Sequence, residues 1–386
     1  MEKTLKNTKF ETFFTILIML LMISLPLAEL IGAFLEKKFF YQEEILSWGG
    51  IILSGFLIIY IIYNLFKKNF KLCLSDIFII LSIIFCIISI YFSKDITKSL
   101  KGEYAYSETP LQTLAYFSLF LISSLILSEK NRNLILYTFV YLGIFECFIA
   151  FLHNFKLWPV SSLFDAKSHT KNHLAFGLTE HCNYFATLAI IFTAIFSGLF
   201  IYNEKKDDLL TYIILSIIGC FASLFTYTRL AMIGIFSTIF GFLLLIILLK
   251  IFYKNKISIK QALKKLLILS ICFLLCFIIV EIFTGSIKKE VSISVSEINK
   301  LQNKETRGSF GTGRGTIWKV GLNSLKKYPL TGVGFDNYRY SFKIYPKNFN
   351  WSQNKGHNEY IHIFVTQGIP SGINYLIFTF WCCLFP

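Results

Sequence analysis

The chain has 386 residues, of which 55% are hydrophobic and only 16% are charged. A soluble protein typically carries about 25% charged residues. The composition also excludes intrinsic disorder, a coiled coil, collagen and a disulfide scaffold. The net charge of +15 could suggest a nucleic-acid partner. In a membrane protein, however, basic residues anchor the ends of the spans, so no nucleic acid is expected.

Apolar runs that are long enough to cross the hydrocarbon core recur along the chain. They are continuous rather than alternating, which predicts helices and not the strands of a barrel. The predicted fold class is therefore an all-α polytopic membrane protein with about ten transmembrane helices. The predicted spans are Thr12–Leu35, Ile45–Phe66, Leu72–Phe92, Leu111–Leu127, Leu134–Phe155, Tyr184–Tyr202, Leu209–Tyr227, Leu230–Phe252, Leu266–Phe283 and a last one within His357–Phe385.

The joints between these spans differ in charge. Basic residues gather at the N-terminus and at every second joint, most densely from Lys250 to Lys265. The positive-inside rule makes these joints cytoplasmic, and the first span reads as a retained helix rather than a cleaved signal. The longest polar segment is then periplasmic. The expected organisation is transmembrane helices 1–9 over 1–283, a large periplasmic loop over 284–356, and a periplasmic helix start with the last span over 357–386.

The predicted loop has an organisation of its own. Its first part, Lys288–Lys304, is polar and rich in serine. Gly313–Tyr328 has the pattern of an amphipathic helix. Pro329 is expected to stop that helix, and the string TGVG that follows predicts a tight turn.

Arg229 lies between two apolar runs, in the string FTYTRLAMIG, close to Thr226 and Thr228. A guanidinium at the membrane surface is suited to bidentate binding of a phosphate. The alternative is an arginine that only snorkels to the interface. Ionisable residues at such positions are often functional, so both interpretations stay open.

Arg314 lies in a glycine-rich stretch, GSFGTGRGTIW. Glycines permit close backbone approach to a ligand, and the start of the helix that follows could bind an anion. Trp318 is four residues further on and would share a helical face with Arg314. The string lacks the GK[ST] ending of a P-loop. The alternative is a flexible linker with one surface arginine.

His357 opens the string GHNEYIHIFVTQGIPSG. If a helix begins there, His357 lies at its start, near the membrane interface, and shares a face with Tyr360, Ile361 and Phe364. His362 would point elsewhere, so the two histidines make a poor metal pair. Considered alone, His357 could be a surface residue or a catalytic base.

One segment between two predicted spans could instead bind a metal, because it contains His169, His173, His181 and Cys182. Two histidines four residues apart on a helix can chelate a metal. However, Lys171 lies between the first two, and apart from Glu180 few carboxylates are nearby. No metal is therefore expected. Glu146, inside the fifth span, is expected to pair within the helix bundle, and its role stays open.

Three strings occur in the C-terminal half in a characteristic order: TYTRLAMIG, GRGTIWKVGLNSLKKYPLTGVGFDNY and GHNEYIHIFVTQGIPSG. With many spans and one large outward loop, they resemble the O-antigen ligase family, which includes O-antigen polymerases and protein O-oligosaccharyltransferases. The upstream string FGLTEHCNYFATLAI is similar to the family's stretch before an asparagine at a span entrance, here Asn183. This chain has His181 and Cys182 where Asn-Pro is common. Family members continue with further spans after H-N-x-Y, so the C-terminus is expected to be truncated relative to the family.

The resemblance implies an enzyme in the bacterial inner membrane with its active site facing the periplasm. It would be a metal-independent glycosyltransferase without cofactors that transfers a glycan from undecaprenyl diphosphate to lipid A-core. In this role Arg229 and Arg314 would hold the diphosphate, and His357 would act as the base at the acceptor hydroxyl. The implied supporting residues are Asn358, Trp318, Gly332, Gly334 and Asn183.

Two other functions remain as alternatives. An O-antigen polymerase would use the same chemistry but join lipid-linked repeat units. A lipid-linked glycan flippase or other transporter belongs to a different class and predicts charged residues near the middle of the spans. In this chain the basic residues with recognisable motifs lie at the predicted outer edge, which favours chemistry at the membrane surface.

Overall fold

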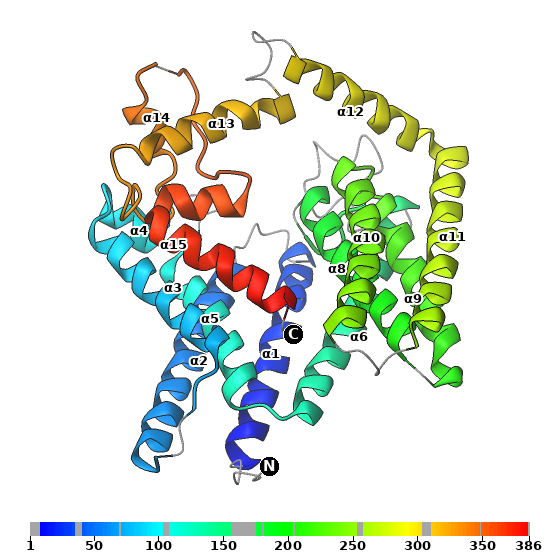
Figure 1. Cartoon of the computed structure of the whole chain (residues 1–386), viewed down its shortest axis with the longest axis horizontal. Helices are drawn as coiled ribbons and strands as arrows, with labels where there is room; N and C mark the ends of the chain where they lie inside the picture. Colours follow the sequence, from blue (N-terminus) through cyan, green and yellow to red (C-terminus); the bar gives the residue numbers. More distant parts are fainter. Residues whose placement is uncertain are drawn as a thin grey trace. The chain divides into compact units, whose positions relative to one another are not determined.

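A computed structural model describes residues 8–34, 41–68, 71–102, 108–155, 175–179, 181–203, 205–252, 258–302, 310–347 and 349–384. All regular elements among these residues are helices (Figure 1). They are α1 (Thr8–Phe34), α2 (Tyr41–Phe66), α3 (Leu74–Tyr91), α4 (Ile96–Lys101), α5 (Pro110–Leu125), α6 (Glu129–Asn154), α8 (Cys182–Tyr202), α9 (Lys206–Leu224), α10 (Arg229–Phe252), α11 (Ile259–Thr284), α12 (Ser286–Gln302), α13 (Phe310–Ser324), α14 (Tyr340–Ile344) and α15 (Glu359–Leu384).

Eight of the described helices are long and apolar enough to cross a membrane, namely α1, α2, α3, α6, α8, α9, α10 and α11. This confirms an all-α, multi-pass protein, but the predicted count of about ten is not confirmed. The predicted span Leu111–Leu127 corresponds to α5, which is apolar but shorter than the others. The last predicted span falls in α15, where the backbone leaves the helical region at Gly368 and Pro370 follows. Proline lacks the amide hydrogen that a continuous helix needs.

The chain forms two compact units, each discontinuous in sequence. The first unit comprises residues 1–21, 42–133 and 297–386, and the second comprises residues 22–41 and 134–296. The first unit therefore combines the two ends of the chain. Each unit is described by itself below.

In the second unit, α8 and α9 pack closely, α10 packs on α8, and α11 contacts α9 and α10 (Figure 1). Glycines permit this closeness. A Cβ at Gly219 would meet Thr193 Oγ1 at 2.7 Å, and one at Gly234 would meet Ile190 Cδ1 at 2.2 Å. Small residues at helix contacts are typical of membrane bundles, because association in lipid depends on close packing.

In the first unit, α15 packs along α3, and polar side chains join the two helices. The Ser89 hydroxyl donates to the Thr366 carbonyl at 2.8 Å. The Asn374 amide donates to Ser82 Oγ at 2.8 Å and to the Phe78 carbonyl at 3.0 Å. Hydrogen bonds between helices are a common stabilising contact within membranes. Together these bonds fix the position of α15, the helix that begins two residues after His357.

The predicted TGVG turn lies against the interruption in α15. Its amides bond to carbonyls of α15, from Val333 to Val365 at 2.9 Å and from Gly334 to Thr366 at 3.0 Å. Gly332 has a φ of 67°, and a Cβ there would meet the Thr366 carbonyl carbon at 2.3 Å. Glycine is therefore required at Gly332 both by the backbone conformation and by the close approach. These backbone bonds compensate for helical bonds that are lost at the interruption.

One expectation for the large loop needs correction, and one helix there was not predicted. Most of the polar segment Lys288–Lys304 is helical, in α12, which begins directly after Gly285 ends α11 with a φ of 62°. The helix predicted over Gly313–Tyr328 instead spans Phe310–Ser324. It ends earlier because the amides of Lys327 and Tyr328 both turn back to the Ser324 carbonyl, at 3.0 Å each. The residue before a proline disfavours the helical conformation, which is consistent with this early end.

Candidate functional site

His357 lies in a short turn just before α15 and not within that helix. Its backbone has a φ of 49°, which is in the left-handed region, and its side chain is exposed. The expected helical face of His357 with Tyr360 and Ile361 is therefore wrong. The residue that caps α15 is Asn358, whose side-chain oxygen accepts from the Ile361 amide at 3.1 Å. Asparagine is among the preferred N-cap residues, and this role explains its place next to His357.

Gly356, the residue before His357, has a side-chain partner for its carbonyl and another for its amide. The indole of Trp318, on α13, donates to the Gly356 carbonyl at 2.9 Å. The amide of Gly356 donates to Nδ1 of His362, on α15, at 3.3 Å. Gly356 itself is buried. Trp318 thus contacts the backbone of the residue before the candidate base, and His362 contributes a contact that was not predicted.

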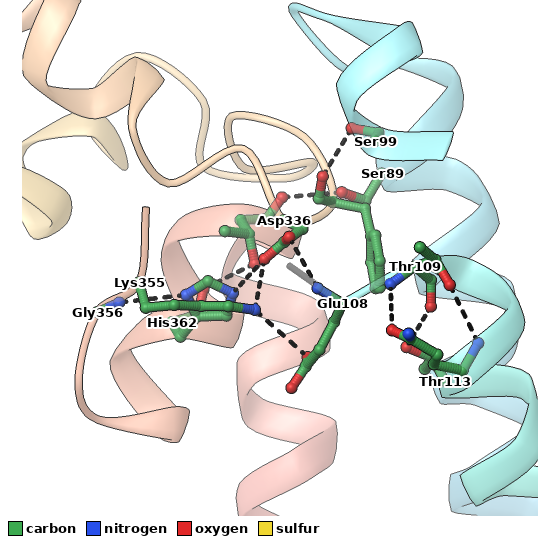
Figure 2. A network of polar contacts seen from close by, with 12 residues as sticks. Ser89, Ser99, Glu108, Thr109, Thr113, Asp336, Lys355, Gly356 and His362 are labelled. Carbon is green, nitrogen blue, oxygen red and sulfur yellow. Dashed lines mark hydrogen bonds and ion pairs between the residues drawn. The ribbon is translucent and has the colours of Figure 1, made fainter. Parts of the chain in front are cut away.

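A buried carboxylate, Asp336, lies next to this turn (Figure 2). Its Oδ1 accepts from Lys355 Nζ at 2.6 Å and lies 3.5 Å from His362 Nε2. Its Oδ2 accepts from the Glu108 amide at 3.0 Å, and Lys355 also lies 3.7 Å from the Glu108 carboxylate. Figure 2 shows the side chains of His362 and Lys355 pointing toward Asp336 from the segments on either side of His357. The two ends of the turn are therefore attached to one buried charge.

Arg314 lies in the first part of α13 in the same unit, and its side chain is exposed. Partial desolvation of the ring by the surrounding protein lowers the pKa of His357 below its ordinary value of 6.5. The nearby positive charge of Arg314 lowers this pKa further. Both effects disfavour the protonated imidazole and so favour the form that can accept a proton.

The start of α13 was expected to offer backbone amides to an anion. Gly311 and Gly313 do have left-handed backbones, with φ of 61° and 91°. The amide of Gly311 donates to the Glu297 carboxylate at 2.8 Å. A carboxylate of the protein therefore already interacts with this helix terminus, as the helix dipole favours.

Arg229 is the first residue of α10, in the second unit. Thr228 caps this helix by accepting from the Ala231 amide at 3.2 Å, and Thr226 contacts Thr228 at 3.0 Å. The two threonines thus have a local structural role. The guanidinium Nε of Arg229 lies 3.7 Å from Glu290 of α12, and its side chain is 34% exposed. Arg229 is therefore a half-exposed cation paired with an acid, which leaves part of the guanidinium open to a ligand.

Asn183, also in the second unit, is exposed in the first turn of α8. His181 caps this helix, because its Nδ1 accepts from the Asn183 amide at 3.0 Å. Glu146 accepts from the Leu178 amide at 2.9 Å, which gives this carboxylate a partner within the bundle. His169 and His173 lie outside the described residues. Among the residues that the structure describes, no group of three potential metal ligands occurs.

The structure thus divides the predicted site residues between the units. The first unit contains Arg314, Trp318, Gly332, Gly334, His357 and Asn358, and the second contains Asn183 and Arg229. The sequence reasoning missed Asp336 and Lys355, and it treated His362 only as a poor metal partner. Asp336 directly follows the TGVGF string, and its position after two required glycines was the available signal.

A comparison with protein families agrees with the resemblance that the three sequence strings indicate. The family described as O-antigen ligase matches residues 214–376, which include both Arg229 and His357. No curated protein and no solved structure gives a significant match to the chain. The resemblance seen in the sequence is thereby confirmed, since residues 214–376 of this chain are similar to the O-antigen ligase family.

Proposed function

We propose that the protein is an O-antigen ligase, which transfers a glycan from undecaprenyl diphosphate to lipid A-core at the periplasmic face of the inner membrane. The family supports ligase or polymerase activity in general. The main support for a transferase site is the turn that presents His357. It carries an exposed imidazole with a lowered pKa in the same unit as the exposed, positively charged Arg314.

The proposed reaction is a single displacement. The imidazole of His357 takes the proton from an acceptor hydroxyl while the hydroxyl oxygen attacks the anomeric carbon of the donor sugar. The bond between that carbon and the diphosphate oxygen breaks, and the electron pair leaves with the diphosphate. Guanidinium groups of Arg314 and Arg229 stabilise the charge that grows on this leaving group. A general base of this kind typically accelerates a reaction about 10²–10⁴-fold.

Purified protein is expected to attach the glycan of a lipid-linked donor to a lipid A-core acceptor, and to do so in the presence of EDTA. Gel analysis of the lipopolysaccharide distinguishes the candidates. Core bearing a polymer identifies a ligase, and longer lipid-linked polymer without core attachment identifies a polymerase. Movement of the donor across vesicles without any new glycosidic bond would instead identify a flippase. Loss of transfer in EDTA, restored by one metal ion, would contradict the metal-independent mechanism.

We also propose that α12 faces the periplasm and that Ser258, before α11, faces the cytoplasm. This orientation rests on the charge asymmetry of the joints. Ser296 and Ser258 are both exposed, so each can be replaced by cysteine in a variant that lacks the exposed Cys73. In cells with a permeabilised outer membrane, an impermeant maleimide should label Ser296→Cys, and Ser258→Cys only after lysis. The reverse pattern would contradict the proposed orientation.

A further inference from the structure

We propose that His362 is a positioning residue that fixes the conformation of the candidate base His357 through the amide of Gly356. The inference rests on the proposed function of His357. His362 does not contact the substrate in this proposal. It acts because its ring nitrogen Nδ1 accepts a hydrogen bond from the amide of Gly356, the residue immediately before the base.

The backbone of His357 requires such support. A φ of 49° is unfavourable for a residue with a Cβ. Conformations of this kind persist only where the surroundings determine them. The adjoining Gly356 is the most constrained part of the turn, since its carbonyl and its amide each have a side-chain partner. The two partners come from different helices, α13 and α15.

His362 is itself held in one orientation. Because Nδ1 accepts from the Gly356 amide, the proton of the neutral ring is assigned to Nε2, which faces Asp336 Oδ1 at 3.5 Å. The ring also stacks on Tyr338, with centroids 5.6 Å apart and an angle of 8° between the planes. The side chains of His362 and Asp336 are only 7% and 4% exposed. A ring with three fixed neighbours has little freedom to rotate.

Asp336 connects this ring to the other side of the turn. The same Oδ1 atom accepts from Lys355, the residue before Gly356. A buried carboxylate is stable only when it is paired and hydrogen-bonded, and Lys355, His362 and the Glu108 amide meet this need. The network therefore fixes Lys355 and Gly356, the two residues before His357. The position of His357 is set by residues that lie outside the reaction itself.

Two substitutions at one position separate positioning from packing. His362→Asn places an acceptor oxygen near the position of Nδ1, so it can still accept from Gly356, but it loses the stack on Tyr338. His362→Phe retains a stacking ring but has no acceptor. If His362 acts through the Gly356 amide, His362→Phe should lower kcat about 10- to 100-fold with little change in KM, because small misplacements of a catalytic group cost this much. His362→Asn should retain most of the wild-type kcat.

The opposite order, with His362→Phe active and His362→Asn inactive, would overturn the proposal in favour of packing. Thermal unfolding of each purified variant in detergent establishes that equal amounts of folded protein are compared. If His362→Phe does not fold, Trp318→Phe decides the matter, because it removes the donor to the Gly356 carbonyl. A lowered kcat with unchanged KM then supports positioning through this peptide, and a wild-type kcat overturns it.

A second comparison separates this proposal from the role of His357. In a protein that already carries His357→Ala, His362→Phe should cause no further loss of kcat, since the group it positions is gone. A further loss of the same size would show that His362 acts independently of His357 and would overturn the inference. If His357→Ala alone transfers glycan at the wild-type rate, the proposed function of His357 fails instead. That result comes from the single variant His357→Ala, so it is distinct from the results of the His362 variants.

Discussion

His357→Ala is expected to lower kcat for glycan transfer about 10²–10⁴-fold, which is the usual contribution of a general base. Binding of the lipid-linked donor should change little, because in the proposed mechanism the imidazole contacts the acceptor hydroxyl. His357 is exposed and lies outside the helices, so its removal should leave folding intact. The measurement is kcat for transfer, together with donor affinity, for the purified variant.

The same assignment fixes the pH dependence. The pKa of His357 is lowered below 6.5 by desolvation and by the charge of Arg314. A base works in its deprotonated form, so kcat should be constant at neutral pH and fall only as the pH drops through a value below 6.5. The control is Gln353→Ala, an exposed substitution in the same segment, which should leave kcat and its pH profile unchanged. Wild-type kcat in His357→Ala would remove His357 from the mechanism.

Replacement of either candidate arginine by lysine is expected to fail, although the positive charge is kept. Lysine has no planar fork and cannot bind a phosphate in the bidentate manner of a guanidinium. Loss of one fixed donor to a developing negative charge typically costs about 10²–10³-fold in kcat. We therefore expect losses of this size in Arg314→Lys and Arg229→Lys when transfer is measured at saturating acceptor.

The ion pair of Arg229 makes its substitution informative. A lysine could retain the attraction to Glu290, which lies 3.7 Å from Arg229. If Arg229 serves only to pair with this acid, Arg229→Lys should be fully active. The same result is expected if Arg229 only snorkels to the membrane interface. Arg339→Lys provides a matched control, because Arg339 is an exposed arginine of the first unit outside the proposed site. Full activity of both candidate variants would assign the two arginines a structural role alone.

Much of the fold could be predicted because a transmembrane helix is defined by local composition. Eight predicted spans match helices to within a few residues at most ends. The largest miss, α12, had a local signal as well. Val291, Val295 and Ile298 follow the period of a helix, but polar and charged residues between them hid the pattern. The interruption of α15 at Gly368 was not predictable from hydropathy, because it depends on the TGVG turn lying beside it.

The candidate site was only partly predictable for the same reason. His357 and Arg314 belong to strings with recognisable motifs, so they could be named from the sequence. The network around them joins Glu108, Asp336 and His362, which come from three distant segments. Their contact depends on the path of the chain, including the glycine turn and the packing of α15 on α3. No spacing along the sequence encodes such a meeting.

The joining of both chain ends in the first unit also sets an order of assembly. The Ser89 hydroxyl and its partner, the Thr366 carbonyl, are 277 residues apart in the sequence. A ribosome makes the chain from the N-terminus, so α3 is complete long before α15 exists. The second unit, by contrast, comes mostly from the continuous stretch 134–296 and can form earlier. The helix that begins after His357 can thus dock on α3 only after the whole stretch 134–296 has been made, and the first unit acquires its candidate base later than the second unit can form.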